Sequence, residues 1–200
     1  MHRTLPPMRS WDIVAPVYDL QLALERPAIT AALDLAQPRS TDRLLDVATG
    51  TGAVLRLLAG RVTRPDDAVG VDRSARMLSR VPPLPAGWRL LRADVQTLPL
   101  PDARFDVATC AYLLHLLPGE ERTRTLAQIR RVLAPGGRFV TVTPVAPPTR
   151  FGSLVRKLVG GYLLDPRVDL ERAGFTIRVA RYVRAGYPSV CVLSEPNAVR

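Results

Sequence analysis

Three aspartates come at the ends of short apolar runs, where their carboxylates could meet one ligand. Asp46 lies inside the first run, Asp72 closes the second and Asp94 closes the third. A carboxylate accepts hydrogen bonds from the hydroxyl groups of a ribose or the amino group of a base, and it repels phosphate. Each aspartate alone could equally be a helix cap or a turn residue. Three of them at successive run ends favour a site for a nucleoside with little negative charge.

A glycine-rich turn follows the first of these runs. The segment from Leu44 to Gly52 reads Leu-Leu-Asp-Val-Ala-Thr-Gly-Thr-Gly, and a helical pattern begins directly after it. Glycines in such a turn let backbone N–H groups approach a ligand at the helix N-terminus. Asp72 follows Gly52 by 20 residues, which is the spacing at which a carboxylate binds ribose hydroxyls. The turn therefore predicts a nucleotide cradle with its ribose-binding acid downstream.

Two nucleotide-binding motifs that are absent from this turn restrict the kind of ligand it can bind. A dinucleotide fingerprint would place a third glycine where Leu55 stands, and a phosphate-binding loop would end in Lys followed by Ser or Thr. S-adenosylmethionine carries adenosine, a sulfonium and an ammonium but no phosphate, so it satisfies these conditions. Its carboxylate can bind the N–H groups of the Gly50–Gly52 turn, and its cationic groups tolerate Asp46. We expect S-adenosylmethionine as the cofactor and no metal site.

Strands and helices alternate along the chain, which indicates a parallel sheet covered on both faces. The expected strands are Arg43–Ala48, Ala68–Val71, Trp88–Arg92, Phe105–Ala111, Arg138–Thr143, Thr176–Val183 and Ser189–Leu193. The expected helices are Ala53–Val62, Ser74–Arg80, Glu120–Leu133, which Pro135-Gly136-Gly137 ends, and Leu170–Ala173. The last two strands must be antiparallel because only a tight turn joins them. The predicted fold class is α/β, a Rossmann-like, doubly wound sheet of seven strands, mostly parallel with one antiparallel strand near the C-terminus.

One domain accounts for all 200 residues. An additional helical segment is expected at Val17–Ala36, where Pro27 divides it and starts the second piece. The expected order is a loose N-terminus (1–10), a helical lid (11–37), a cofactor-binding core (38–144), a substrate-cap segment (145–172) and C-terminal strands (173–200). Apolar residues at helical spacing in the cap segment fit a packed helix, a lid over an apolar substrate, or a basic amphipathic face on a membrane.

The chain is strongly basic, with a formal charge of +10, and all of its 28 basic residues except Lys157 are arginine. The arginines are dispersed and no aromatic residues interleave them, which argues against a nucleic-acid partner. Peripheral contact with an anionic membrane stays open, as does the oligomeric state. No apolar run reaches the ~18 residues of a membrane span, and the first residues lack the apolar region of a signal peptide. We therefore expect a cytoplasmic protein with a small-molecule substrate, in which Cys110 and Cys191 are buried hydrophobes.

The sequence resembles the class I S-adenosylmethionine-dependent methyltransferases over nearly its whole length. The run Leu45 to Gly52 is similar to motif I of that family, and Val71-Asp72-Arg73-Ser74-Ala75-Arg76-Met77-Leu78 is similar to its ribose-binding segment. Asp94 to Asp106 matches the adenine-side segment and fourth strand, and Arg131 to Gly137 resembles the turn before the fifth strand, with Ala134 where Lys is common. Trp11 to Asp19 resembles the N-terminal lid of the quinone-methylating branch.

The resemblance implies roles for individual residues. Asp72 would bind the ribose hydroxyls, Met77 would pack beside the adenosine, and Asp94 with Val95 would bind the adenine. Further cofactor contacts are implied at Tyr18, which would close over the site, and at Asp46, Ala48, Thr49, Gly50, Gly52, Arg73, Cys110 and Ala111. His115 is the candidate general base, although a histidine in so apolar a run also fits a packed, hydrogen-bonded role.

The expected activity is methyl transfer from S-adenosylmethionine to a small, apolar, lipid- or quinone-like molecule. A substrate nucleophile would attack the sulfonium methyl in line, so the protein would mainly supply alignment and a dry site. One alternative is a protein that binds the cofactor without transferring its methyl group, because the motifs diagnose binding better than chemistry. The other alternative is a nicotinamide-dependent oxidoreductase, which Leu55 and Asp46 both oppose.

Overall fold

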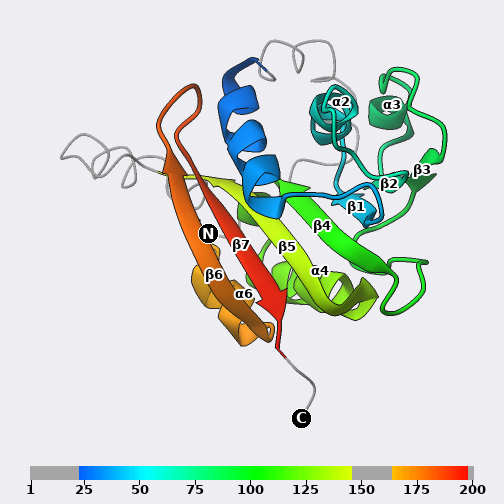
Figure 1. Cartoon of the computed structure of the whole chain (residues 1–200). Helices are drawn as coiled ribbons and strands as arrows, with labels where there is room; N and C mark the ends of the chain where they lie inside the picture. The colour runs from blue at the N-terminus through cyan, green and yellow to red at the C-terminus, as the bar shows by residue number, and fades with distance from the viewer. Residues whose placement is uncertain (1–22, 146–163, 198–200) are drawn as a thin grey trace.

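The computed structural model describes residues 23–145 and 164–197, which form a seven-stranded sheet between two layers of helices (Figure 1). The strands are β1 (Arg43–Val47), β2 (Asp67–Asp72), β3 (Trp88–Arg92), β4 (Phe105–Ala111), β5 (Leu133–Pro144), β6 (Phe175–Val183) and β7 (Ser189–Pro196). The helices are an N-terminal helix (23–36), α2 (Ala53–Ala59), α3 (Ala75–Leu78), the short 3-10 helix η1 (Leu114–Leu116), α4 (Gly119–Val132) and α6 (Arg167–Arg172). The predicted fold class is confirmed.

The strand order is β3-β2-β1-β4-β5-β7-β6, and only β7 runs against its neighbours. The chain builds outward from β1 to β3 and then returns to add β4 on the other side of β1. In a sheet of this kind, ligands bind at the carboxyl ends of the strands beside that reversal. The topology therefore predicts a site above β1 and β4, where the glycine-rich turn leaves β1.

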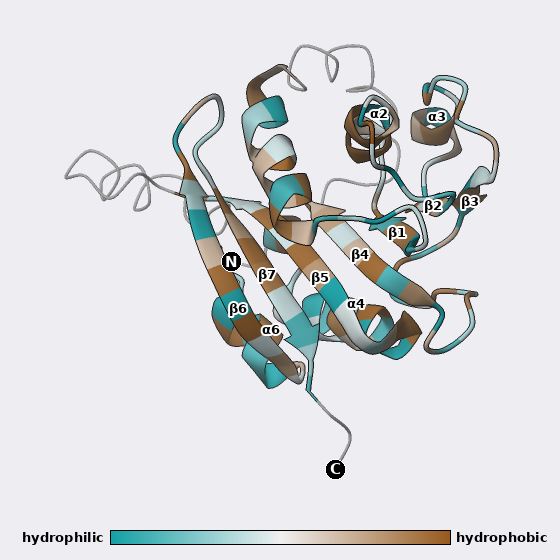
Figure 2. Ribbon diagram, viewed as in Figure 1, coloured by the Kyte–Doolittle hydropathy of each residue, from teal (hydrophilic) through white to brown (hydrophobic). Residues whose placement is uncertain are grey.

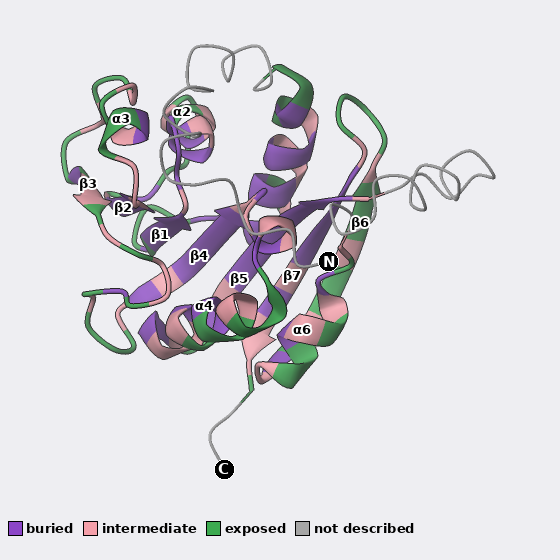
Figure 3. Cartoon of the chain, turned by 180° about the vertical axis from the view of Figure 1, so that it is seen from behind, coloured by how far each residue is buried: buried purple, intermediate pink, exposed green. Residues whose placement is uncertain are grey.

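Two apolar cores cover the two faces of the sheet, because alternate residues of each strand point to opposite sides. Leu45 and Val47 pack with α4 and α6 on one side, whereas Leu44 packs with the N-terminal helix and α2 on the other. Hydrophobic colours run along much of the central strands (Figure 2), and these strands are buried while β6 is largely exposed (Figure 3). The sheet is thus a rigid base for the loops at its carboxyl edge.

Several elements begin or end up to a few residues from the predicted positions, among them α2, which ends at Ala59, and α6, which begins at Arg167. Two further differences concern the N-terminal helix and β5. The N-terminal helix is continuous from 23 to 36, so the predicted division at Pro27 is wrong. Pro27 lacks only one N–H group, and the burial of Ala28, Ile29 and Leu33 against the sheet keeps the helix in one piece. β5 begins at Leu133, and Pro135-Gly136-Gly137 forms an irregularity inside the strand, where the pairing jumps from Phe105–Leu133 to Val107–Arg138.

Part of the predicted organisation lies outside the described residues. Residues 1–22, which include Tyr18 and residues 11–22 of the predicted lid, lie outside the described residues, as do residues 146–163 of the predicted cap. Among the residues that are described, no helix combines the length and apolar character needed to cross a bilayer. Within the same residues, no group of three or more His, Cys, Asp or Glu side chains is placed to hold a metal ion.

Candidate functional site

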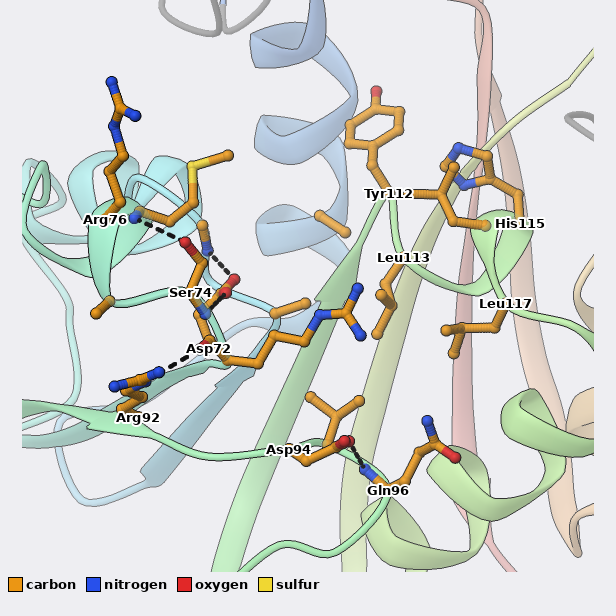
Figure 4. A pocket seen from close by; sticks show the side chains of 18 of the residues that line it. Asp72, Ser74, Arg76, Arg92, Asp94, Gln96, Tyr112, Leu113, His115 and Leu117 are labelled. Carbon is orange, nitrogen blue, oxygen red and sulfur yellow. Dashed lines mark hydrogen bonds between the residues drawn. The ribbon is translucent and has the colours of Figure 1, made fainter. Parts of the chain in front are cut away.

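A cavity of about 470 Å³ opens at the carboxyl ends of β1, β2, β3 and β4 (Figure 4). Four of its residues mark those strand ends: Ala48 after β1, Asp72 in β2, Asp94 after β3 and Ala111 in β4. Because four successive strands contribute to it, the cavity lies at the place that the topology predicts for a ligand.

The glycine-rich turn joins β1 to α2 with a backbone that requires glycine at Gly52. That residue has a φ of 82° and is the N-cap of α2, and a Cβ atom there would lie 2.9 Å from Cγ1 of Val81. The Gly50 N–H donates to Oδ2 of Asp72 (2.9 Å), and the Gly52 N–H donates to the Thr49 carbonyl oxygen (2.8 Å). These two N–H groups therefore have partners within the protein and are not free for a ligand carboxylate, in contrast to the sequence-based expectation.

Asp72 connects this turn to the segment that follows β2. Its Oδ2 accepts from the Gly50 N–H, and its Oδ1 accepts from the Ser74 N–H at 2.9 Å (Figure 4). Burial raises the pKa of the Asp72 carboxyl, while these two hydrogen bonds oppose the increase. A carboxylate has about four acceptor positions, so Asp72 retains acceptor capacity on the wall of the cavity. Ser74, not Asp72, caps α3, since its Oγ accepts from the Met77 N–H.

Asp94 supplies a second carboxylate to the same cavity. Its side chain is exposed, and its Oδ1 accepts a hydrogen bond from the Gln96 N–H at 2.8 Å. Val95 and Gln96 line the cavity beside it, and the sulfur-containing side chain of Met77, which is almost fully buried, lines it from α3. Two hydrogen-bond acceptors and an apolar surface are thus available to a flat, amino-bearing base and its ribose.

Asp46 lies behind the cavity wall and not on it. Its side chain is 1% exposed and accepts hydrogen bonds from the hydroxyls of Thr49 (2.6 Å) and Thr109 (2.7 Å). Burial raises the pKa of Asp46 to about 6, although both hydroxyls favour the charged form. The residue lines only a second cavity of about 10 Å³, which it shares with Glu25 and Tyr112 and which has room for about one water molecule. Asp46 is therefore separated from the larger cavity by its wall and does not line it.

The part of the cavity around η1 is apolar and aromatic. It is formed by Tyr112, Leu113, Leu116 and Leu117, which follow β4, and by Tyr187 from the turn between β6 and β7. In Figure 4, Leu113, Leu117 and His115 lie across the cavity from Asp72 and Ser74. The ring centroid of Tyr112 lies 6.5 Å from that of His115 and 6.2 Å from that of Tyr187. Such a surface suits an apolar ring and not a charged group.

His115 is the histidine beside this aromatic surface and lines the same part of the cavity. Its Nδ1 atom is buried and has no hydrogen-bond partner among the described residues. Burial lowers the pKa of His115 to about 4, because a charged imidazolium loses its hydration there. His115 is therefore neutral at physiological pH and is a weak base, which favours a hydrogen-bonding role over general-base catalysis.

The structure brings most of the predicted site residues together. Those that line the cavity are Ala48, Gly50, Asp72, Arg73, Met77, Asp94, Val95, Ala111 and His115. Asp46, Thr49, Gly52 and Cys110 are buried behind its wall, and Tyr18 lies outside the described residues. Burial raises the pKa of the Cys110 thiol, so this side chain stays protonated and only its backbone is available to a ligand.

Sequence reasoning missed several lining residues. They are Ser74, Ala75, Arg76, Arg92, Gln96, Tyr112, Leu113, Leu116, Leu117 and Tyr187. Most of them are close in sequence to predicted residues and lie at the ends of the same strands. Tyr187 is different, since it is 75 residues beyond Tyr112 and reaches the cavity only through the antiparallel hairpin. No local signal marks it.

Comparisons with known proteins agree with this geometry. A family model described as a methyltransferase domain matches residues 44–137. The chain is 34% identical over 153 residues to a demethylmenaquinone methyltransferase of Thermus thermophilus, covering 72% of this chain and 68% of that protein. It is 32% identical over 166 residues to a 2-phytyl-1,4-naphtoquinone methyltransferase of Synechococcus elongatus, covering 76% and 68%. A solved S-adenosylmethionine-dependent methyltransferase from Mesorhizobium loti shares the fold, with a TM-score of 0.64, 24% identity and coverage of 86% and 97%.

Proposed function

This chain belongs to the S-adenosylmethionine-dependent methyltransferases, and on that premise we propose that it methylates a ring carbon of a reduced naphthoquinone or a closely related apolar ring compound. The main observation behind the proposal is that the cavity has a polar part and an apolar, aromatic part. Carboxylates line the part at β2 and β3, and tyrosines and leucines line the part at η1. Relatives named for demethylmenaquinone and phytyl-naphthoquinone support the same class of acceptor.

We propose that the polar part of the cavity binds the cofactor. Asp72 accepts from the ribose hydroxyls with its remaining acceptor positions, and Asp94 with Val95 holds the adenine edge. Met77 and Arg73 pack along the adenosine. The residues fit S-adenosylmethionine because Asp72 and Asp94 provide acceptors for its ribose and its adenine amino group. When bound, this cofactor supplies a methyl group that its sulfonium has already activated.

The remaining cofactor contacts are proposed at the ends of β1 and β4. The backbone of Ala48, Gly50, Cys110 and Ala111 borders the place between the two parts of the cavity, and Thr49 and Gly52 fix the turn from behind. The charge of Asp46 favours a cationic ligand over a neutral one. These groups hold the methionine part without chemical participation.

The aromatic part of the cavity is proposed to hold the acceptor and to exclude water. Methyl transfer to a ring carbon needs an electron pair from the ring. The new carbon–carbon bond would form as the carbon–sulfur bond of the sulfonium breaks and S-adenosylhomocysteine leaves, and the methylated ring carbon would then lose its proton to solvent. A hydroquinone has that electron pair available, whereas the oxidised quinone is itself electron-poor. His115, neutral and bordered by Tyr112, is placed to hydrogen-bond one hydroxyl of such a ring.

Transfer of an isotopically labelled methyl group tests the proposal. Purified protein is incubated without oxygen with methyl-labelled S-adenosylmethionine and a chemically reduced 2-prenyl-1,4-naphthoquinone, and the products are analysed by mass spectrometry. We expect a product with one labelled methyl group on a ring carbon, and no product from the same compound kept oxidised. Cofactor binding without a labelled product from the reduced ring would contradict the proposed acceptor. If a pool of cell metabolites also gave no labelled product, the alternative of binding without transfer would replace it.

A further inference from the structure

We propose that the turn between β6 and β7 forms one wall of the acceptor site through Tyr187, and that Gly186 positions this wall by seating the turn on the N-terminal helix. Tyr187 is then a specificity-determining residue and Gly186 a positioning residue. The inference deepens the proposed function and rests on it, because it assumes that an apolar ring occupies the aromatic part of the cavity.

Tyr187 contributes a partly exposed aromatic residue to the lining of the cavity. Its side chain lines the cavity while the residue remains 44% exposed. Its ring packs against Tyr112, with centroids 6.2 Å apart and planes inclined by 55°. Tyr112 lies next to His115 and across the cavity from Asp72 (Figure 4), so Tyr187 belongs to the aromatic part. An exposed aromatic surface inside a cavity is a typical contact for an apolar ring.

Gly186 allows the turn to touch the N-terminal helix directly. The Tyr187 N–H donates to the carbonyl oxygen of Leu24 at 2.9 Å. A Cβ atom at position 186 would lie 2.1 Å from the same Leu24 oxygen, well inside van der Waals contact. Gly186 also has a φ of 70°, a conformation that side chains with a Cβ atom rarely adopt. Any other residue would push the turn away from the helix and carry Tyr187 with it.

Three further contacts fix the turn from the sheet side. The Ser189 hydroxyl donates to the Tyr187 carbonyl oxygen at 2.8 Å, so the Tyr112 hydroxyl, 2.9 Å from Ser189 Oγ, donates to Ser189. The Val145 N–H donates to the Pro188 carbonyl oxygen at 3.0 Å. The turn is therefore held between the N-terminal helix and the ends of β4 and β5. These contacts give the Tyr187 ring a defined position, which a free surface loop would not do.

Equilibrium binding to the complex with S-adenosylhomocysteine tests the role of Tyr187. The probe is reduced 2-prenyl-1,4-naphthoquinone, titrated without oxygen. We expect Tyr187→Ala to raise the Kd of the probe about tenfold, because a partly exposed aromatic contact is lost. Tyr187→Phe should stay within about twofold of the wild type, since the ring is kept. The Kd of S-adenosylhomocysteine should not change in either variant.

Tyr182→Ala is the matched control for Tyr187→Ala. Tyr182 is an exposed tyrosine of the neighbouring strand β6, 56% exposed, and it does not line the cavity. Its removal should leave the Kd of the probe unchanged. The assignment is overturned if Tyr187→Ala binds the probe as tightly as the wild type, or if it weakens S-adenosylhomocysteine as much as the probe.

Gly186→Ala tests the positioning role, with Gly136→Ala as its matched control. Both glycines have a positive φ, 70° and 74°, but no atom lies within 4 Å of the Cβ position at Gly136. The two variants therefore share the backbone strain and differ in the collision with Leu24. We expect Gly186→Ala alone to raise the Kd of the probe, by about as much as Tyr187→Ala, with the Kd of S-adenosylhomocysteine unchanged. Equal effects of the two substitutions on probe binding would overturn the positioning role.

The same titration separates this inference from the proposed function. If the wild-type complex with S-adenosylhomocysteine binds the reduced probe, but the protein does not methylate that probe when S-adenosylmethionine is supplied, the proposed reaction is contradicted. The comparison of Tyr187 variants still decides the role of the turn. A wild-type protein that methylates the probe while Tyr187→Ala binds it normally supports the reaction and overturns the role of the turn. A wild-type complex that does not bind the probe at all overturns both.

Discussion

Replacing Asp72 by alanine is expected to weaken the binding of S-adenosylhomocysteine about 100-fold, measured by isothermal titration calorimetry. The carboxylate is proposed to accept two hydrogen bonds from ribose hydroxyls, and losing hydrogen bonds to a charged acceptor typically costs about 3 kcal/mol. Asp72 also accepts from the Gly50 N–H, so its loss releases the glycine-rich turn at the same time. Both effects act on the same cofactor, and both reduce its affinity.

Asp67→Ala is the matched control, because Asp67 begins the strand that Asp72 ends. Its carboxylate pairs with Arg89 and Arg104 at the opposite edge of the sheet. This variant should bind S-adenosylhomocysteine with the wild-type Kd. An Asp72→Ala protein that is folded, as judged by circular dichroism, and binds the cofactor normally would contradict the assignment of Asp72 to the ribose.

Replacing Asp46 by asparagine is expected to make the cofactor-free protein more stable by about 2 kcal/mol at pH 7.5. Burial raises the pKa of Asp46 from 3.8 to about 6, which corresponds to a cost of about 3 kcal/mol for keeping the charged form in the fold. Asparagine removes the charge and can keep both hydroxyl partners. Thr49 can donate to its oxygen, and Thr109 can accept from its amide and donate to the Leu45 carbonyl oxygen, 3.4 Å away.

The stability difference between Asp46→Asn and the wild type should depend on pH, and the pKa of Asp46 determines the direction of that dependence. Because the pKa of Asp46 is higher in the folded than in the unfolded chain, the folded state binds more protons between pH 4 and pH 6. The contribution of Asp46 to stability is therefore largest below about pH 4 and is lost as the pH rises through about 6. Urea unfolding at several pH values should show that Asp46→Asn gains stability over the wild type at pH 7.5 and little or none at pH 4.

Binding data complete the test of Asp46. If its charge attracts the cofactor, Asp46→Asn should lose affinity for S-adenosylmethionine by more than for S-adenosylhomocysteine, which lacks the sulfonium charge. Thr109→Val should act in the opposite direction on stability, since it removes one of the two hydroxyls that stabilise the carboxylate. A wild-type-like stability of Asp46→Asn at pH 7.5 would show that the buried carboxylate carries no cost.

The sheet and the polar part of the cavity could be predicted because local patterns determine them. Short apolar runs between helical segments predict the strands, and Asp72 and Asp94 follow from where strands end. The glycine-rich turn was recognisable, yet the partner of its Gly50 N–H is Asp72, 22 residues away, and only the folded chain brings them together. Local patterns therefore located the turn but did not show which of its N–H groups are free.

The aromatic part of the cavity could not be predicted, because it depends on packing between distant segments. Tyr187 reaches Tyr112 only after β7 has paired with β5 and the turn has docked on Leu24. Pro27 is a similar case, since the prediction used its local preference and the buried helix face outweighed it. Long-range contacts, and not local secondary-structure propensities, determine both the position of Tyr187 and the continuity of the helix through Pro27.

A crystal structure of the complex with S-adenosylhomocysteine tests the division of the cavity most directly. It should show the ribose hydroxyls within hydrogen-bond distance of the Asp72 carboxylate, the adenine beside Asp94 and Val95, and the aromatic part of the cavity, beside Tyr112 and Tyr187, free for an acceptor. Adenosine bound against Tyr112 and Tyr187 in the aromatic part of the cavity, with no contact to Asp72, would contradict both the cofactor assignment and the proposed acceptor site.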